Sequence, residues 1–558
     1  MSQSDSRTPA SYLKRRPSPP VVTLAVGILA STVVLLWHAR KLWFFGDEWE
    51  FLYQRGLTGG NGPGPFEPHN EHWSTIPLVL YRVMWQVVGL QHYQLWDLMP
   101  IAALMVGSVG LFVLLRRAGA ADWVAVACAV VLAWNGAGED TLWAFQIGFL
   151  GSLTAGILAC LAVLSATSWR GLVLANVLLV AGLMCSGLGI PMVAWAALFT
   201  LMLRGWRTTL AVAVVPTLVY LAWYAAYGSS AVPDDEDPYV SWMQFVTYVW
   251  AGIGHVWDVT TGAPVGTVMF VALVAVALFA RVTDELHALA VSGVVTTVFA
   301  YGMLASSRAD LGPEQAQSLR YVPLGLVLTL PAFAILVGLV VAVLPGRRIE
   351  RYAVAAGLVL VLVGSSYAST QTFAHDRANF MQGVEQRVLT GVYLEEKGEP
   401  LLRTTVEANS QTIDVGLLTA PGQRDHVPVV TPDDDELWTG RAQFRVAAMA
   451  APADIPFAHH VSGVGVGGDL DLSDCAEVAT NVLPLGYVEV PAGVKGTQIG
   501  LRNPGTALSV QLVHDGEVSE AATITTGAGQ TVYVASNVPD ADLRITLTTD
   551  TFGVCDHG

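Results

Sequence analysis

The 558-residue sequence contains little charge. Lys, Arg, Asp and Glu make up only 13% of it, whereas hydrophobic residues make up 53% and the mean hydropathy is +0.50. A soluble domain carries about 25% charged residues. The deficit excludes a simple soluble protein and indicates that much of the chain lies in lipid. Lys/Arg clusters are also lacking outside the segments expected to be cytoplasmic, which argues against a nucleic-acid partner.

Cysteine is scarce as well, with five residues in the whole chain. Cys128, Cys160 and Cys185 lie within apolar runs and are expected to pack as small hydrophobic side chains. Cys475 and Cys555 stand alone in the polar C-terminal part. An isolated pair in an extracytoplasmic domain predicts a disulfide. No spacing resembles a zinc site. We expect no organic cofactor, and the sequence leaves a divalent cation open.

The few charges are unevenly distributed. From Thr372 onward the chain carries 25 Asp/Glu against 10 Lys/Arg, a net of −15 out of a total of −16. The chain therefore consists of an apolar part followed by an acidic part. We predict a cytoplasmic tail over 1–20, a transmembrane domain over 21–370, a connecting helix over 371–397 and an extracytoplasmic β-rich domain over 398–558.

The first apolar run, Val21–Trp37, follows the basic residues 14–16. This pattern also occurs in secretory signal peptides, but a bulky aromatic and basic run follows here in place of a small-residue cleavage site. We interpret the run as an uncleaved first span with a cytoplasmic N-terminus.

Later basic clusters mark the cytoplasmic side by the positive-inside rule. They are Arg116/Arg117, Arg170, Arg204/Arg207, Arg281 and Arg347/Arg348/Arg351. The apolar stretches that they delimit are 98–115, 123–166, 172–203, 210–280, 286–344 and 353–367. The first and last stretch each hold one crossing and the others hold two, although 172–203 is short for a pair. The sequence predicts about eleven transmembrane helices and an external C-terminus.

The acidic part begins with an expected helix over Phe373–Glu396. Short β-type runs follow, separated by turn sequences such as Asp515-Gly516. The runs are Gln411–Leu418, Gln498–Leu501, Ser509–His514, Thr531–Ala535 and Leu543–Thr548. The fold class is thus a polytopic α-helical membrane protein with a C-terminal β-sandwich-like domain.

The first external loop, residues 38–97, is too long for a simple connection. It contains the carboxylate pair Asp47-Glu48 among aromatic residues, then a histidine-containing stretch, and then an expected amphipathic surface helix over Ile76–Leu90. A carboxylate pair at the end of a span is unfavourable near lipid unless it has a use. The alternative is that both are solvated charges in the interfacial aromatic belt.

The order of these features resembles the polyprenyl-phosphate-dependent GT-C glycosyltransferases, which include protein O-mannosyltransferases, aminoarabinose transferases and actinobacterial arabinofuranosyltransferases. The resemblance covers residues 20–370 as architecture and includes a late Arg-Tyr pair that enters a span. It implies that Asp47 is the catalytic base, with Glu48 beside it. The family's His-Pro-Pro-Leu pattern is altered here to His-Trp-Ser-Thr-Ile-Pro-Leu over 72–78. The resemblance therefore does not fix the roles of His69 and His72.

The implied reaction needs a carboxylate to accept the proton of an acceptor hydroxyl and a cation to hold the departing phosphate. For that phosphate the sequence offers Arg320, its neighbour Tyr321 and, less directly, Arg308. Arg320 could equally be an arginine that extends from a span to the interface. One carboxylate acting as base, without a covalent intermediate, implies inversion at the anomeric carbon.

Substrate hydroxyls need polar partners, and five candidates lie in the first two external loops: His69, Glu71, His72, Glu139 and Asp140. The expected partners are a polyprenyl-phosphate-linked sugar, a glycan acceptor and the bilayer. Two other interpretations stay open. One is a lipid or polysaccharide transporter or flippase, although transporters usually bury charges in mid-span. The other is a non-catalytic cell-envelope assembly protein, in which the β-rich domain is the active part.

Overall fold

The computed structural model divides the chain into two compact units, which are described separately. It describes residues 18–57, 63–134, 138–231, 240–343, 348–409, 411–462, 470–471, 476–479, 487–502, 507–526, 531–547 and 551–555. The helical unit comprises Met1–Phe44, Gln54–Val88 and His92–Phe380. The C-terminal unit comprises Phe45–Tyr53, Gly89–Gln91 and Met381–Gly558. The first external loop therefore contributes to both units.

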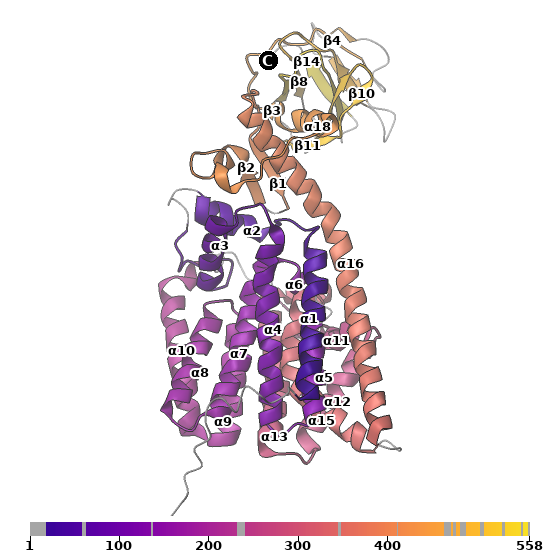
Figure 1. Cartoon of the computed structure of the whole chain (residues 1–558). Helices are drawn as coiled ribbons and strands as arrows, with labels where there is room; N and C mark the ends of the chain where they lie inside the picture. Colours follow the sequence, from indigo (N-terminus) through magenta and orange to yellow (C-terminus); the bar gives the residue numbers. More distant parts are fainter. Residues whose placement is uncertain are drawn as a thin grey trace, which may run out of the picture. The chain divides into compact units, whose positions relative to one another are not determined.

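The helical unit is a bundle of apolar helices (Figure 1). Its elements are α1 (Pro19–Ala39), α3 (Thr75–Val87), α4 (Tyr93–Arg117), α5 (Asp122–Ala133), α6 (Gly138–Thr141), η3 (Ala144–Gln146), α7 (Ile147–Ser165), α8 (Trp169–Leu183), α9 (Gly189–Arg204), α10 (Trp206–Ala226), η4 (Gly228–Ala231), α11 (Trp242–Thr261), α12 (Gly266–Phe279), α13 (Asp284–Arg308), η5 (Ala309–Leu311), α14 (Pro313–Ala316), η6 (Leu319–Tyr321) and α15 (Val322–Val343). The last helix, α16 (Arg348–Glu396), begins in this unit and ends in the other.

Each stretch in which we predicted a crossing contains at least one helix. Among the described residues, six helices are long and apolar enough to cross a membrane, or seven if the bent pair α11–α12 counts as one span. The helices α8 and α9, in the stretch that looked short for two spans, have 15 and 16 residues. These helices support a multi-pass membrane protein, and the predicted count of eleven is not confirmed.

The bend between α11 and α12 measures 100° and has a local cause. Gly262 ends α11 with a left-handed backbone (φ 70°), which glycine adopts without steric penalty. The Asp258 carboxylate then accepts a hydrogen bond of 2.6 Å from the backbone N–H of Gly266, the first residue of α12. Two helix ends are thus satisfied at the bend, and Asp258 has a structural role.

The amphipathic helix predicted over Ile76–Leu90 is observed as α3. Leu78, Tyr81 and Trp85 lie on its buried side, whereas Val83 and Val87 are exposed. This is the spacing expected of a helix with one apolar face packed against protein.

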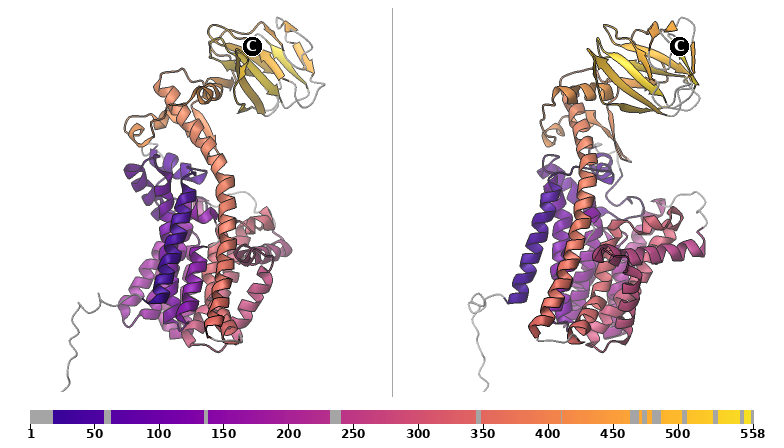
Figure 2. Two further views of the ribbon diagram at one scale, coloured as in Figure 1. Left: turned by 45° about the vertical axis from the view of Figure 1, so that its right-hand side comes forward. Right: turned by 90° about the vertical axis from the view of Figure 1, so that its right-hand side faces the viewer.

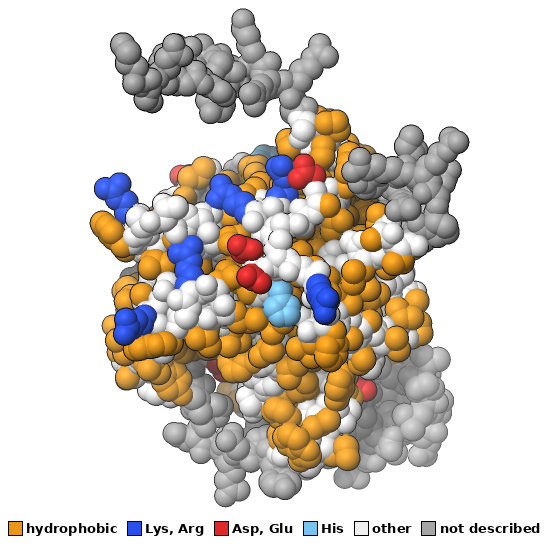
Figure 3. Space-filling model, turned by 90° about the horizontal axis from the view of Figure 1, so that it is seen from below, with side chains coloured by type: hydrophobic (Ala, Val, Ile, Leu, Met, Phe, Trp, Pro, Cys, Tyr) orange, Lys and Arg blue, Asp and Glu red, His pale blue; other side chains and the backbone are white. Residues whose placement is uncertain are grey.

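Basic side chains gather on one end of the helical unit, within a surface that is otherwise largely hydrophobic (Figure 3). Helix α4 ends at Arg117 and α9 ends at Arg204, two of the predicted cytoplasmic markers. Apolar side chains such as Leu218 of α10, which is 60% exposed, face outward on the bundle, as helices in lipid require. The cytoplasmic position of this end remains a prediction.

The C-terminal unit is rich in strands (Figure 2). Its elements are α2 (Asp47–Trp49), η2 (Glu50–Leu57, up to Tyr53), β1 (Thr405–Ala408), β2 (Gln411–Asp414), α17 (Val415–Leu418), η7 (Arg424–His426), α18 (Asp434–Phe444), β3 (Val446–Met449), β4 (His460–Val461), β5 (Leu470–Asp471), β6 (Ala476–Ala479), β7 (Tyr487–Val490), β8 (Thr497–Arg502), β9 (Ala507–His514), β10 (Glu517–Val518), β11 (Ala522–Thr525), β12 (Thr531–Ser536), β13 (Asp542–Leu547) and β14 (Thr551–Cys555).

Two five-stranded antiparallel sheets form most of this unit. Their orders are β10-β9-β13-β7, with β11 also on β9, and β3-β12-β8-β14-β6. Residues of both sheets, among them Val510 and Ile545 of one and Leu501 and Val534 of the other, belong to one hydrophobic core. The strand-rich C-terminal domain is thus confirmed, while its description as a β-sandwich remains a prediction. One predicted strand is only half correct, because 415–418 forms α17 and not the end of a strand.

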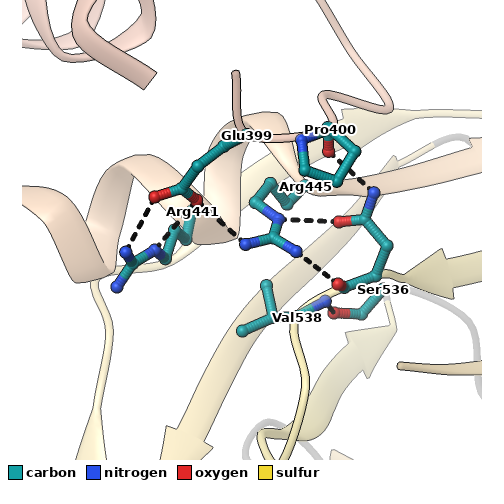
Figure 4. A network of polar contacts seen from close by, with 7 residues as sticks. Glu399, Pro400, Arg441, Arg445, Ser536 and Val538 are labelled. Carbon is teal, nitrogen blue, oxygen red and sulfur yellow. Dashed lines mark hydrogen bonds and ion pairs between the residues drawn. The ribbon is translucent and has the colours of Figure 1, made fainter. Parts of the chain in front are cut away.

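Polar contacts join the residues just after α16 to this domain (Figure 4). The Glu399 carboxylate pairs with Arg441 at 2.8 Å and with Arg445 at 2.9 Å. Arg445 also donates to the Asn537 side chain at 2.8 Å, and Asn537 donates to the carbonyl of Pro400 at 2.7 Å. Since charged hydrogen bonds fix geometry strongly, this network ties together segments far apart in sequence.

The predicted disulfide cannot be followed, because Cys475 lies outside the described residues. The residues next to the two cysteines, Ala476 of β6 and Val554 of β14, are paired in the antiparallel sheet. The Cys475–Cys555 bond therefore stays a prediction.

Candidate functional site

A short turn in the first external loop presents the first group of polar residues. The backbones of His69 and His72 exchange hydrogen bonds of 3.0 and 2.9 Å. Asn70, between them, has a positive φ of 49°, which asparagine tolerates better than most residues. The turn carries His69, Glu71 and His72, three of the residues predicted to contact substrate.

Glu71 connects this turn to the end of α13. Its carboxylate lies 3.3 Å from a guanidinium nitrogen of Arg308, whose other terminal nitrogen donates to the hydroxyl of Tyr321. The backbone carbonyl of Tyr321 in turn accepts a 2.9 Å hydrogen bond from the hydroxyl of Tyr301. Burial raises the pKa of Glu71, but the charge of Arg308 and further interactions outweigh it and hold the pKa below its usual value. Glu71 and Arg308 thus form a charged pair beside Tyr321.

Glu139 holds the turn that precedes α15. One of its carboxylate oxygens accepts hydrogen bonds from the Ser318 hydroxyl at 3.0 Å and from the backbone N–H of Arg320 at 3.3 Å. Glu139 lies in α6, within the second external loop. Its carboxylate is therefore engaged in positioning the backbone of η6, and the Arg320 side chain is free of this contact.

Asp140, the next residue, is in a different environment. It is fully buried, and neither carboxylate oxygen has a hydrogen-bond partner among the described residues. Burial raises the pKa of Asp140 well above the usual carboxyl range, the charge of Glu139 raises it further, and the charge of Arg320 opposes both. A buried carboxyl group without a partner is unfavourable, so Asp140 favours a proton or a polar ligand.

The guanidinium of Arg320 is half-buried and near Asp140. Within the described part of the chain it has no carboxylate at ion-pair distance, and its buried Nε has no hydrogen-bond partner. Its Cζ atom lies 5.4 Å from the centre of the Tyr321 ring. Arg320 thus carries a positive charge beside a buried acidic group at the start of an apolar helix.

The two histidines of the turn, His69 and His72, lie beside aromatic rings. His69 stands edge-on to Phe145 at 5.2 Å, and His72 stands edge-on to Phe149 at 5.8 Å. Burial lowers the pKa of His72 to about 4, although the charge of Glu71 opposes this effect. His72 is therefore neutral at physiological pH and can donate or accept a hydrogen bond.

The helical unit brings together eight of the predicted site residues. They are His69, Glu71, His72, Glu139, Asp140, Arg308, Arg320 and Tyr321. Glu71 and Arg308 are 237 positions apart, and Glu139 and Arg320 are 181 apart, so only the fold joins them.

Asp47 and Glu48 belong to the C-terminal unit and are described with it. Asp47 is half-buried and begins α2, which continues into the π-helical turn η2. Glu48 is fully buried, and its carboxylate accepts a hydrogen bond of 2.8 Å from the backbone N–H of Phe45. Glu48 thus stabilises the start of this helical segment.

Sequence reasoning missed several residues of the site. Ser318, Tyr301 and Tyr248 carry no motif, and tyrosines in apolar runs are usually packing residues. The hydroxyl of Tyr248, on α11, is buried without a hydrogen-bond partner among the described residues, and its charge interactions include Arg308 and Arg320. The sequence Ser318-Leu-Arg-Tyr is the only local signal, since it places a hydroxyl two residues before the arginine.

Two arginines, two buried or half-buried acids and several hydroxyls can bind a phosphorylated polar group at the end of an apolar bundle. Among the described residues, no group of three or more His, Cys, Asp or Glu side chains is placed to hold a metal ion. The question of a divalent cation stays open.

Comparisons with known proteins give a distant structural likeness. No protein-family model and no curated protein matches the sequence. Among solved structures, the chain is similar to the crystal structure of ArnT from Cupriavidus metallidurans bound to undecaprenyl phosphate. The identity is 14% and the TM-score 0.43, over 78% of this chain and 88% of that one. A likeness at this level assigns no function.

Proposed function

We propose that the protein is a membrane glycosyltransferase that moves a sugar from a polyprenyl-phosphate donor to a hydroxyl group of an extracytoplasmic acceptor, in first place a cell-envelope glycan. The observation that carries the proposal is the environment of Arg320. Its guanidinium has no ion pair within the described residues and lies near the buried Asp140, at the start of an apolar helix. An arginine in this position suits a phosphate whose lipid lies along the bundle.

In the proposed reaction the acceptor oxygen attacks the anomeric carbon of the sugar. The bond between that oxygen and the carbon forms while the bond from the carbon to the phosphate oxygen breaks. Asp47 accepts the proton of the acceptor hydroxyl, and the electron pair of the broken bond leaves with the lipid phosphate. Arg320 stabilises the negative charge that grows on this phosphate. A single displacement inverts the anomeric configuration.

The other residues have supporting roles in the proposal. Arg308, paired with Glu71, holds the Tyr321 hydroxyl in place. Asp140 and the neutral His72 provide hydrogen bonds for hydroxyl groups of the sugar.

The distribution of polar residues favours an enzyme over a transporter. The polar cluster lies in loops and at helix ends, at the end of α13 and before α15. A transport pathway is expected to place its charges near the middle of the spans. The position of the cluster favours chemistry at the membrane surface.

The test is transfer from radiolabelled polyprenyl-phosphate sugars by the full-length protein in detergent. We expect Asp47→Asn to abolish transfer and to keep donor binding, because the carboxylate acts on the acceptor proton. Glu50→Gln is the matched control, since it removes a half-buried carboxylate three residues away in the same segment. Full activity of Asp47→Asn would exclude Asp47 as the base. Donor binding without transfer by the wild type would favour an assembly protein.

A further inference from the structure

The segment that follows α16 contacts the first external loop near both of its ends. We define the hairpin segment as residues 405–427, which contain β1, β2, α17 and η7. Two pieces of the first external loop, Phe45–Tyr53 and Gly89–Gln91, belong to the same compact unit as this segment. The loop piece that contains Asp47 is therefore packed with the C-terminal part of the chain.

The first anchor lies next to Asp47. Helix α2 packs against strand β2 of the hairpin (Figure 1). Burial raises the pKa of Tyr53, six residues after Asp47, and the charge of Asp414, the last residue of β2, raises it further, so the two side chains lie near each other. In the same piece of the loop, Trp49, Phe51 and Leu52 are almost fully buried. The segment that begins with Asp47 is therefore held by packing against the hairpin.

The second anchor lies at the end of α3. The backbone N–H of Leu90 donates a hydrogen bond of 2.7 Å to the carbonyl oxygen of His426. Gly89 has a positive φ of 61°, and a Cβ atom at this position would lie 2.2 Å from the same oxygen. Only glycine permits this approach of two backbones.

The hairpin segment is itself braced. Arg424 forms a two-point ion pair with Glu396 at the end of α16, with one of the two contacts at 2.9 Å. It also donates to the carbonyl of Val427 at 2.7 Å. The Asp414 carboxylate accepts a 2.9 Å hydrogen bond from the backbone of Gly416 and so caps α17. Because both contact points, strand β2 and His426, adjoin locally fixed turns, the segment is suited to hold another chain piece in place.

We infer that the hairpin segment is the positioning element for the loop that carries Asp47, with Gly89 as the positioning residue. The inference rests on the proposed function in one respect, since it takes Asp47 to be the base. A carboxylate that must meet an acceptor hydroxyl loses efficiency steeply when it is displaced by about 1 Å. The C-terminal unit thereby contributes to catalysis through geometry, without touching the substrate.

The test compares Gly89→Ala with Gly422→Ala in the full-length protein. Both glycines have positive φ, so both variants carry the same kind of backbone strain, but a Cβ at Gly422 meets nothing within 4 Å. We expect Gly89→Ala to lower kcat about 10- to 100-fold with an unchanged KM for the donor. Hydrogen exchange of residues 45–53, measured by mass spectrometry, should become faster in Gly89→Ala and stay unchanged in Gly422→Ala.

Arg424→Ala removes the brace of the turn that carries His426 and leaves Gly89 in place, so it serves if Gly89→Ala does not fold. Like Gly89→Ala, it should speed the hydrogen exchange of residues 45–53 and lower kcat. Unchanged exchange in both variants would overturn the anchoring, and faster exchange with unchanged kcat would overturn its role in catalysis. If the wild type transfers no sugar from any donor, the proposed function and the catalytic role fail together, while the exchange data still decide the anchoring.

Discussion

Replacing Arg320 with alanine distinguishes two roles of this residue: an arginine that binds the phosphate, and an arginine that only extends to the membrane interface. The side chain has no ion pair among the residues that the structure describes, and the contact with Glu139 uses the backbone N–H, which alanine keeps. The free energy of unfolding should therefore change by no more than about 0.5 kcal/mol. If the guanidinium holds the leaving phosphate, its loss removes about 3 kcal/mol of transition-state stabilisation, roughly a hundredfold in kcat/KM.

Arg308→Ala gives the contrasting result. This substitution breaks the ion pair with Glu71 and the hydrogen bond to the Tyr321 hydroxyl. The Glu71 side chain is 51% exposed, so the ion pair contributes little, whereas the Arg308 side chain is only 16% exposed and its loss leaves Tyr321 unpaired. We expect a loss of about 1–2 kcal/mol in stability together with a loss of transfer.

The assay combines transfer from a radiolabelled polyprenyl-phosphate sugar with thermal unfolding of the same detergent preparations. Arg207→Ala is the control, because Arg207 is exposed and its guanidinium lies over the ring of its neighbour Trp206. The reasoning is refuted if Arg320→Ala transfers sugar at the wild-type rate with wild-type donor affinity. It is also refuted if the variant loses activity only in proportion to lost folded protein.

Two further predictions concern the C-terminal unit. Hydrogen bonds from Arg441, then the charges of Arg441 and Arg445, hold the pKa of Glu399 below its usual value, with burial opposing them. This stabilisation is present above the unfolded-state pKa and is lost as the pH falls through the folded-state pKa. In Glu399→Gln the protection from hydrogen exchange should therefore decrease less as the pH is lowered. For Cys475 and Cys555, mass spectrometry after alkylation without reductant should find both unmodified, and one modified cysteine would refute the disulfide.

The apolar part of the fold could be predicted because hydropathy and basic clusters are local signals. They placed a helix in every expected stretch, and α3 followed its amphipathic pattern. The number of crossings could not be predicted in the same way, since it depends on bends. Gly262 and the capping carboxylate of Asp258 divide a stretch that composition alone presents as continuous. The Gly-Ala-Pro that follows Thr261 is a signal that could have indicated the break.

The site was predictable only as a set of residue types. Charged residues near the ends of apolar runs are candidate site residues in any membrane protein, and only the resemblance to a known family indicated which of them to prefer. Their partners are a property of the fold, as the pairing of Glu71 with Arg308 shows. Other acidic residues prove to have local roles that sequence could reveal. The run that begins at Asp433 forms a capping box, in which Asp433 and Glu436 bond each other's backbone at the start of α18.

The neighbours Glu139 and Asp140 show how one short helix can serve both structure and chemistry. The Glu139 carboxylate accepts hydrogen bonds from Ser318 and from the backbone N–H of Arg320. It therefore fixes the backbone of Arg320 without forming an ion pair with its guanidinium. Asp140 has no hydrogen bond of its own among the described residues and is influenced by the Arg320 charge. The arrangement therefore keeps a cation and a buried acid close together and both available to a ligand.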